Sequence, residues 1–163
     1  MPLTTRAFTL QLHLHSKAAL AERRNEDMDR IYTISNYYDG PIDGVASVNG
    51  EPHIYKCIFD EKEDEYLKIY SLQLISIECF DLFMEQWGIW LRWEVAFKRG
   101  VVAADSHPAL PEERKRNEEL NELINSLTQE NNAIFKTLKA EFMLPETPSW
   151  ASLWQVKWHE TNT

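Results

Sequence analysis

Glu94 is the residue whose surroundings first suggest chemistry in this chain. Between residues 76 and 100, apolar side chains recur at helical spacing on one face, and Glu94 lies one turn further along it. The apolar residues of this face are Phe80, Phe83, Met84, Trp87, Trp90 and Leu91. A carboxylate there must be paired, hydrogen-bonded or protonated, because an isolated buried charge is very costly. Glu94 is therefore either an acid, base or ligand anchor or, as we expect, a structural partner of a polar group on the sheet.

His53, Tyr38 and Asp39 are the polar side chains that could share a pocket with Glu94. His53 follows a predicted hairpin turn, and Tyr38 and Asp39 belong to a loop punctuated by Gly and Pro. Imidazole, phenol and carboxylate groups are common in ligand and acid–base sites. If the four groups converge on an open cavity, they form a small-molecule or enzyme pocket. If they lie apart, each is a hydrogen-bonding partner within the fold.

No recognised catalytic pattern accompanies these residues. The chain contains no phosphate-binding Gly-rich loop, dinucleotide fingerprint, nucleophile elbow or zinc-protease motif. His13 and His15 have a spacing that can place two metal ligands together, but no third ligand accompanies them. We therefore expect no catalytic residue, no metal and no cofactor. The missing motifs weigh against enzyme activity without excluding it.

The elements that must position these residues fall into two strand blocks around a helical pair. Alternating or β-rich segments predict strands over residues 30–35, 44–48, 51–59 and 66–75, with Asn49-Gly50 as a type I′ hairpin turn. Ser76 and Gly100 delimit a helix over 77–99, and Pro111 begins a second helix. Residues 138–144 and 154–159 alternate again, as the arms of a hairpin.

This order of elements predicts an α+β fold. Neither strand block is large enough for a stable sheet alone, so residues 30–75 and 136–159 should form one antiparallel sheet. We expect a curved antiparallel sheet or a small open barrel around the central Trp-rich helix, with a second antiparallel helix beside it. Residues 28–163 form this single domain. Residues 1–27 are an accessory amino-terminal segment or a start-site extension, since Met28 could be an alternative start.

Trp93 and Phe97 lie on a second side of the long helix, so the helix is apolar around much of its girth. This arrangement indicates burial on more than one side. A core helix is the simpler interpretation, and a dimer or partner interface at Trp93 and Phe97 is the functional one.

Composition limits the classes of partner. The net charge is −9, which opposes binding to nucleic acid and to anionic membrane surfaces and favours basic protein partners. No stretch approaches 18 consecutive apolar residues, and no signal peptide is evident, so the cytoplasm is the expected location. Cys57 and Cys79 sit in apolar patterns typical of buried thiols, and a disulfide between them stays open.

The chain from about Arg30 onward resembles a group of small bacterial proteins with no established activity. The resemblance rests on the YDGPxxGVAxxNGxPH segment over residues 38–53, the Trp-rich helix and the HPALP segment over residues 107–111. It implies one integral domain and no catalytic role. We therefore expect a non-catalytic interaction or accessory module that binds a protein partner or itself. The alternative is a small-molecule binder or enzyme with a pocket around Glu94, His53, Tyr38 and Asp39.

Overall fold

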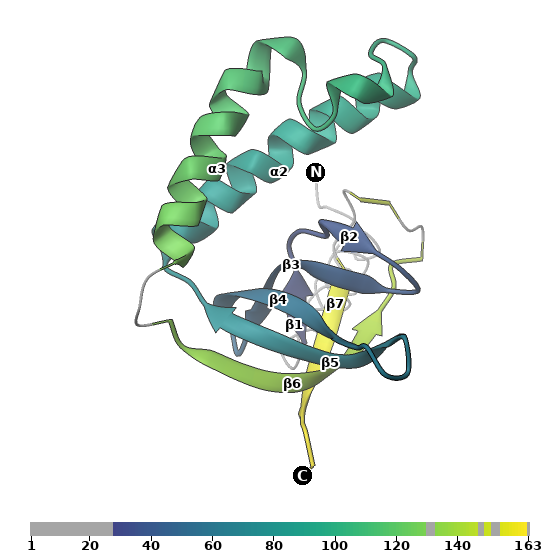
Figure 1. Ribbon diagram of the computed structural model, residues 1–163, viewed down its shortest axis with the longest axis vertical. Coiled ribbons are helices and arrows are strands. Elements are labelled where there is room, and N and C mark those ends of the chain that lie inside the picture. Colours follow the sequence, from purple (N-terminus) through teal and green to yellow (C-terminus); the bar gives the residue numbers. More distant parts are fainter. Residues whose placement is uncertain (1–27, 130–132, 147–148, 151–153, 163) are drawn as a thin grey trace, which may run out of the picture.

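The protein consists of an antiparallel β-barrel with a helical hairpin projecting from it (Figure 1). The computed structural model describes residues 28–129, 133–146, 149–150 and 154–162. The expected accessory segment over residues 1–27, including His13 and His15, lies outside the described residues. The α+β class is confirmed.

Seven strands form one antiparallel sheet in the order β1-β7-β6-β5-β4-β3-β2. A further pairing between β1 and β3 closes six of these strands into a barrel and leaves β2 flanking β3. The strands are β1 (Asp29–Ile31), β2 (Asn36–Tyr37), β3 (Pro41–Val48), β4 (Glu51–Asp60), β5 (Glu65–Leu74), β6 (Phe135–Met143) and β7 (Trp154–Glu160). The prediction of a single antiparallel sheet is therefore confirmed, but the barrel is closed and not open.

Barrel closure depends on the short link that follows β1. The backbone N–H groups of Tyr32 and Thr33 both donate to the carbonyl of Val45, at 2.8 and 3.1 Å. The Thr33 hydroxyl in turn accepts a hydrogen bond from the Val45 N–H at 2.8 Å. These bonds continue the β1–β3 pairing past Ile31, so the link runs along β3 although it is not a regular strand.

A buried tyrosine holds the same link from inside the barrel. Tyr55 of β4 is fully buried, and its hydroxyl donates to the Thr33 carbonyl at 2.7 Å. Gly44 lies between them with a φ of +155°, and a Cβ placed there would lie 2.1 Å from the Thr33 carbonyl oxygen. Because only glycine leaves room for this approach, Gly44 permits the hydrogen bond that closes the barrel.

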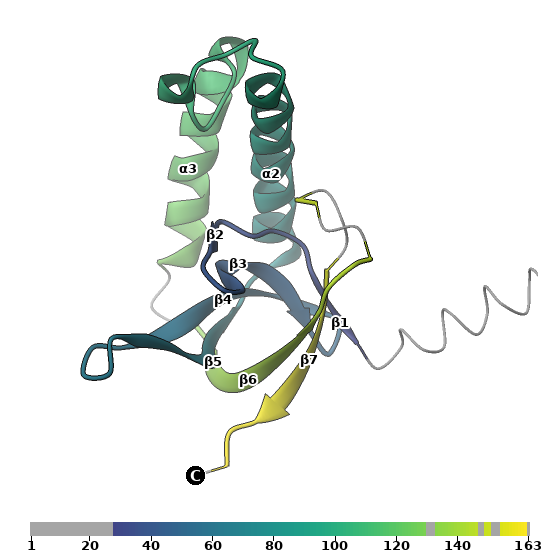
Figure 2. The same ribbon diagram turned by 90° about the vertical axis from the view of Figure 1, so that its right-hand side faces the viewer.

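The barrel interior is filled mainly by side chains of its own strands, and Trp87 of α2 packs against the same cluster. The large buried residues of this core include Ile31, Tyr55, Tyr70, Leu72, Leu138, Trp154 and Val156. The long helix consequently lies outside the barrel, and the prediction that the sheet wraps around residues 77–99 is wrong (Figure 2). Its first turns pack on the outer face, where Phe80 and Phe83 contact a cluster that contains Val45. Because the side chains on both faces of β3 are buried, β3 contributes to the barrel core and to the cluster that packs against α2.

The helical hairpin consists of α2 (Ile77–Lys98) and α3 (Arg114–Thr128), joined through the short 3₁₀ turns η1 (Ala104–Ser106) and η2 (Pro111–Glu113). The predicted ends of α2 are confirmed, since the Ser76 hydroxyl accepts from the Cys79 N–H and Gly100 has a φ of +72°. The second helix was expected to begin at Pro111, but Pro111 begins η2 and α3 starts at Arg114. Two ion pairs, Glu85–Arg116 and Arg92–Glu113, join the helices. Neither helix is long and apolar enough to cross a lipid bilayer.

Gly44→Ala tests the closure of the barrel. The added methyl group would overlap the Thr33 carbonyl, which is backbone and cannot rotate away, so we expect a loss of about 3 kcal/mol in unfolding free energy. Gly88→Ala in α2 is the matched control. Its methyl group meets only the flexible end of Arg92 at 3.3 Å, and higher helix propensity should add about 0.5–1 kcal/mol. Urea denaturation measures both; a Gly44→Ala protein as stable as the parent would contradict this account.

Candidate functional site

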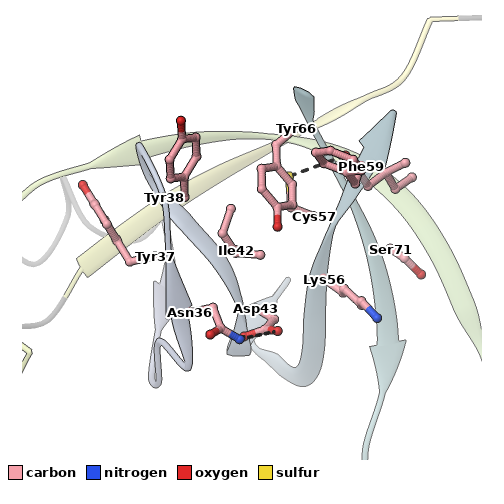
Figure 3. A pocket seen from close by; sticks show the side chains of 11 residues that line it. Asn36, Tyr37, Tyr38, Ile42, Asp43, Lys56, Cys57, Phe59, Tyr66 and Ser71 are labelled. Carbon is pink, nitrogen blue, oxygen red and sulfur yellow. Dashed lines mark hydrogen bonds between the residues drawn. The ribbon is translucent and has the colours of Figure 1, made fainter. Parts of the chain in front are cut away.

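Two overlapping cavities of about 670 and 1010 Å³ lie beside the β2–β3 turn and the β4–β5 hairpin. We call the hollow that the two cavities form together the aromatic groove. The residues that line both cavities are Tyr37, Tyr38, Ile42, Cys57, Phe59 and Tyr66. Figure 3 shows the groove with Tyr38 on one side and Phe59 and Tyr66 on the other.

The rings of the aromatic groove are unusually exposed. Tyr38 is 74% exposed, Tyr37 47%, Phe59 44% and Tyr66 38%. Phe59 and Tyr66 meet edge to face with ring centres 5.0 Å apart, and Tyr38 lies 6.3 Å from Tyr66. Large aromatic rings that gather at a surface hollow mark a binding site more often than an ordinary surface does.

The backbone beneath these rings is strained. Asp39, Asp64 and Lys68 have φ angles between +53° and +57°, in the left-handed region that residues other than glycine rarely adopt. The β4–β5 register also shifts between Cys57 and Phe59, which is an irregularity of the β-bulge kind. Bulges bend a strand and redirect its side chains. The distorted end of the hairpin is the part that carries Phe59 and Tyr66 into the groove.

Acidic groups outnumber basic groups around the groove. The smaller cavity is lined by one carboxylate, Asp43, and by one ammonium group, Lys56. The larger cavity is lined by four carboxylates, Asp39, Asp64, Glu65 and Glu141, and by one ammonium group, Lys68. Glu141 pairs with His159 at 3.0 Å. The other three carboxylates make no ion pair with any described residue, so they are available to a ligand. The groove therefore favours positive charge.

The floor of the groove contains two buried polar side chains, Tyr70 and Cys57. Tyr70 donates its hydroxyl to the Pro41 carbonyl at 2.6 Å, and burial raises the pKa of Tyr70 far above its usual range. No histidine among the described residues lines the groove beside Cys57. The Tyr70 hydrogen bond connects the floor to the start of β3.

The four residues expected to form one pocket do not line one cavity. Tyr38 and Asp39 line the aromatic groove together. His53 is 3% exposed on β4, with its Nδ1 2.8 Å from the Glu51 carbonyl, and burial lowers its pKa. Glu94 lies on α2 and pairs with Lys98 at 2.8 Å, so its partner is on its own helix and not on the sheet. Neither His53 nor Glu94 lines the groove.

Trp93 and Phe97, the expected interface pair, stack with ring centres 5.0 Å apart. Trp93 is 6% exposed and donates its indole N–H to the Ser106 hydroxyl at 2.9 Å. It therefore fastens the loop after α2 to the helix. Phe97 is 43% exposed, so a partner could reach it but would find Trp93 already covered.

Sequence reasoning missed Phe59, Tyr66 and Tyr37 as site residues. Phe59 and Tyr66 flank the acidic segment over residues 60–65, and Tyr37 precedes a turn. A signal was present, because aromatic residues at both ends of an acidic hairpin and in a Gly-Pro turn are more apolar than surface loops require. Phe59 and Tyr66 face each other across the β4–β5 hairpin, whereas the proximity of Tyr38 to Tyr66 depends on the packing of distant segments.

Comparisons with protein-family models, with curated proteins and with solved structures found no match to this chain. Within the described residues, no group of three or more His, Cys, Asp or Glu side chains is arranged to hold a metal ion. The assignment of function therefore rests on the geometry and charge of the groove.

The burial of His53 predicts that the unfolding free energy of the protein depends on pH. Burial lowers its pKa in the folded state below the ordinary value of about 6.5, so the unfolded chain takes up the proton more readily. The stability that the protein gains from keeping His53 neutral is fully present above a pH of about 6.5. It is lost as the pH falls through the pKa of the folded state. The urea midpoint of the parent should drop more between pH values of about 7.5 and 5.5 than that of His53→Gln. Equal drops in both proteins would contradict the prediction.

Glu94→Gln should change stability little. The partner ammonium group of Lys98 is 67% exposed and one turn away on the same helix, so the pair contributes about 0.3–0.5 kcal/mol. Trp93→Ala removes a buried indole and its hydrogen bond and should cost about 3–5 kcal/mol. Thermal or urea unfolding of both variants measures the contrast. A Glu94→Gln loss comparable to that of Trp93→Ala would show that the carboxylate has a structural role beyond Lys98.

Proposed function

We propose that this protein is a non-catalytic interaction module that binds a basic segment of a partner protein in the aromatic groove. The observation that carries the proposal is the combination, at one surface hollow, of exposed rings and of carboxylates that form no ion pair with a described residue. Aromatic faces and carboxylates together select guanidinium and ammonium groups, through cation–π attraction and charge-assisted hydrogen bonds.

The size and shape of the groove support an extended segment as ligand. The lining of its two cavities includes Asn36 of β2, Cys57 of β4 and Leu144 just after β6. A cavity of about 1010 Å³ lies at the upper end of the range for small ligands, so it accommodates several side chains of a peptide. A flexible Arg or Lys can lay its methylene stem on Tyr38 or Tyr66 while its charged end meets Asp39, Asp64 or Glu65.

Net charge supports a protein partner over a nucleic acid. The chain carries 26 acidic and 17 basic residues, so its long-range field repels phosphate backbones and attracts cationic surfaces. The acidic β4–β5 turn, with Asp60, Glu61, Glu63 and Asp64, extends this field beside the groove. Association should consequently be faster at low ionic strength.

Tyr66→Ala should weaken binding of an arginine-containing peptide by about tenfold, the effect of removing a desolvated cation–π partner. Fluorescence anisotropy with a labelled Arg-Gly repeat peptide measures the affinity, and a Glu-Gly repeat tests the sign of the charge. Phe135→Ala is the matched control, because Phe135 is 62% exposed on β6 but does not line the groove. The control should bind like the parent.

Asp64→Asn and Glu65→Gln together should reduce affinity for the Arg-Gly peptide and flatten its dependence on salt, since two carboxylates near the groove are neutralised. Failure of the parent to bind basic peptides more tightly than acidic ones would overturn the proposed function. Equal loss in Tyr66→Ala and Phe135→Ala would place the binding surface elsewhere.

A further inference from the structure

A second and smaller cavity, of about 250 Å³, lies between the helical hairpin and the link after β1. We call it the amide pocket. It is lined by Thr33, Ile34, Ser35, Phe83, Gln86, Trp87, Trp90, His107, Pro108, Asn117 and Asn121. These residues come from the β1–β2 link, from both long helices and from the loop before η2, so the pocket forms only when barrel and hairpin are together.

The lining of the amide pocket combines apolar side chains with neutral polar ones, and His107 is its one titratable group among the described residues. Within the part of the chain that the structure describes, no Asp, Glu, Lys or Arg lines it, although 26% of the sequence is charged. The nearby charged groups of the hairpin are already paired, Glu85 with Arg116 and Arg92 with Glu113. A pocket of this kind disfavours an ionised ligand, because a buried charge needs a counter-charge.

The polar side of the pocket is held in place by contacts among its own amides. The Gln86 side-chain N–H₂ donates to Oδ1 of Asn121 at 2.6 Å and, more weakly, to Oδ1 of Asn117 at 3.5 Å. The Nδ2 groups of both asparagines and Oε1 of Gln86 make no hydrogen bond with any described residue. Fixed amides therefore retain both donors and an acceptor for a ligand.

Two tryptophans of α2 also line the pocket. Trp87 and Trp90 stack with ring centres 4.8 Å apart and an angle of 19° between their planes. The Trp90 indole N–H lies 3.3 Å from Nε2 of His107, which fixes the orientation of that ring. Both tryptophans are only partly buried, so ring surface remains accessible on a long apolar helix face.

We infer that the amide pocket binds a neutral monosaccharide or a terminal neutral sugar unit. Each sugar hydroxyl can donate and accept a hydrogen bond, and amide and hydroxyl side chains can serve as its acceptor or as its donor. The C–H face of a pyranose is apolar and packs on an indole ring. The cavity is slightly smaller than the usual range for drug-sized ligands, which fits a single ring better than an oligomer. This site is independent of the aromatic groove.

Titration of the full-length protein with neutral hexoses tests the inference. The probes are glucose, galactose, mannose and N-acetylglucosamine, up to about 50 mM, with the indole N–H signals of Trp87 and Trp90 followed by NMR. At least one hexose should give a saturable shift of these two signals. Its charged relatives, glucosamine and glucuronate, should bind about tenfold more weakly or not at all.

Asn121→Ala is the decisive variant, because Asn121 is exposed on α3 and its loss should leave the fold intact. It should weaken hexose binding by about tenfold or more. Asn125→Ala, one turn further along α3 and outside the pocket, is the matched control and should bind like the parent. The absence of any saturable hexose shift in the parent would overturn the inference. Equal binding by Asn121→Ala and the parent, or saturable binding of adenosine or uridine with none of hexoses, would also overturn it.

Discussion

The hydrogen bond from the buried Tyr55 hydroxyl to the Thr33 carbonyl is the interaction on which the rest of the structure depends. A buried hydroxyl or carbonyl without a partner costs about 1–3 kcal/mol, so the two groups hold each other in the barrel interior. The bond adds a contact from the barrel interior to a link that β3 also holds through the Val45 and Asp43 carbonyls. Gly44 makes the close approach possible, and Val45 secures the link from the neighbouring strand.

The position of this link explains why both candidate sites occur where they do. Thr33, Ile34 and Ser35 line the amide pocket, and the next residues along the chain, Asn36 to Tyr38, line the aromatic groove. One side of the link therefore faces the helical hairpin, and its continuation reaches the end of the barrel. Asp29 supports the arrangement at the start of β1, because its carboxylate accepts from the backbone N–H groups of Asn49 and Gly50 and from the Ser47 hydroxyl. The contacts that close the barrel thus also fix the positions of residues that line both candidate sites.

Local chemistry in the sequence was sufficient to predict the turns and helix ends but not the position of the helix. Asn49-Gly50 adopts left-handed angles in the β3–β4 turn, and Ser76 and Gly100 delimit α2, because each depends on neighbouring residues alone. The apolar face of α2 indicated that the helix is buried, but not which surface it packs against. It packs on the outer face of the barrel through Phe80 and Phe83, since Tyr55, Tyr70 and Leu72 already fill the interior. Glu94 was expected to pair with the sheet because the helix was expected to lie inside it. Tyr66 was missed because its contact with Tyr38 brings distant segments together, although Phe59 faces it directly across the β4–β5 hairpin.

Amide hydrogen exchange in Tyr55→Phe tests the central claim most directly, because this substitution removes one hydroxyl and leaves the ring in place. If the Tyr55–Thr33 bond fixes the link, the amides of Thr33, Ser35 and Val45 should exchange about tenfold or more faster than in the parent, whereas the β6–β7 pairs keep their protection. Tyr32→Phe is the control, since the Tyr32 hydroxyl makes no hydrogen bond with any described residue. Unchanged exchange at Thr33, Ser35 and Val45 in Tyr55→Phe would contradict the account.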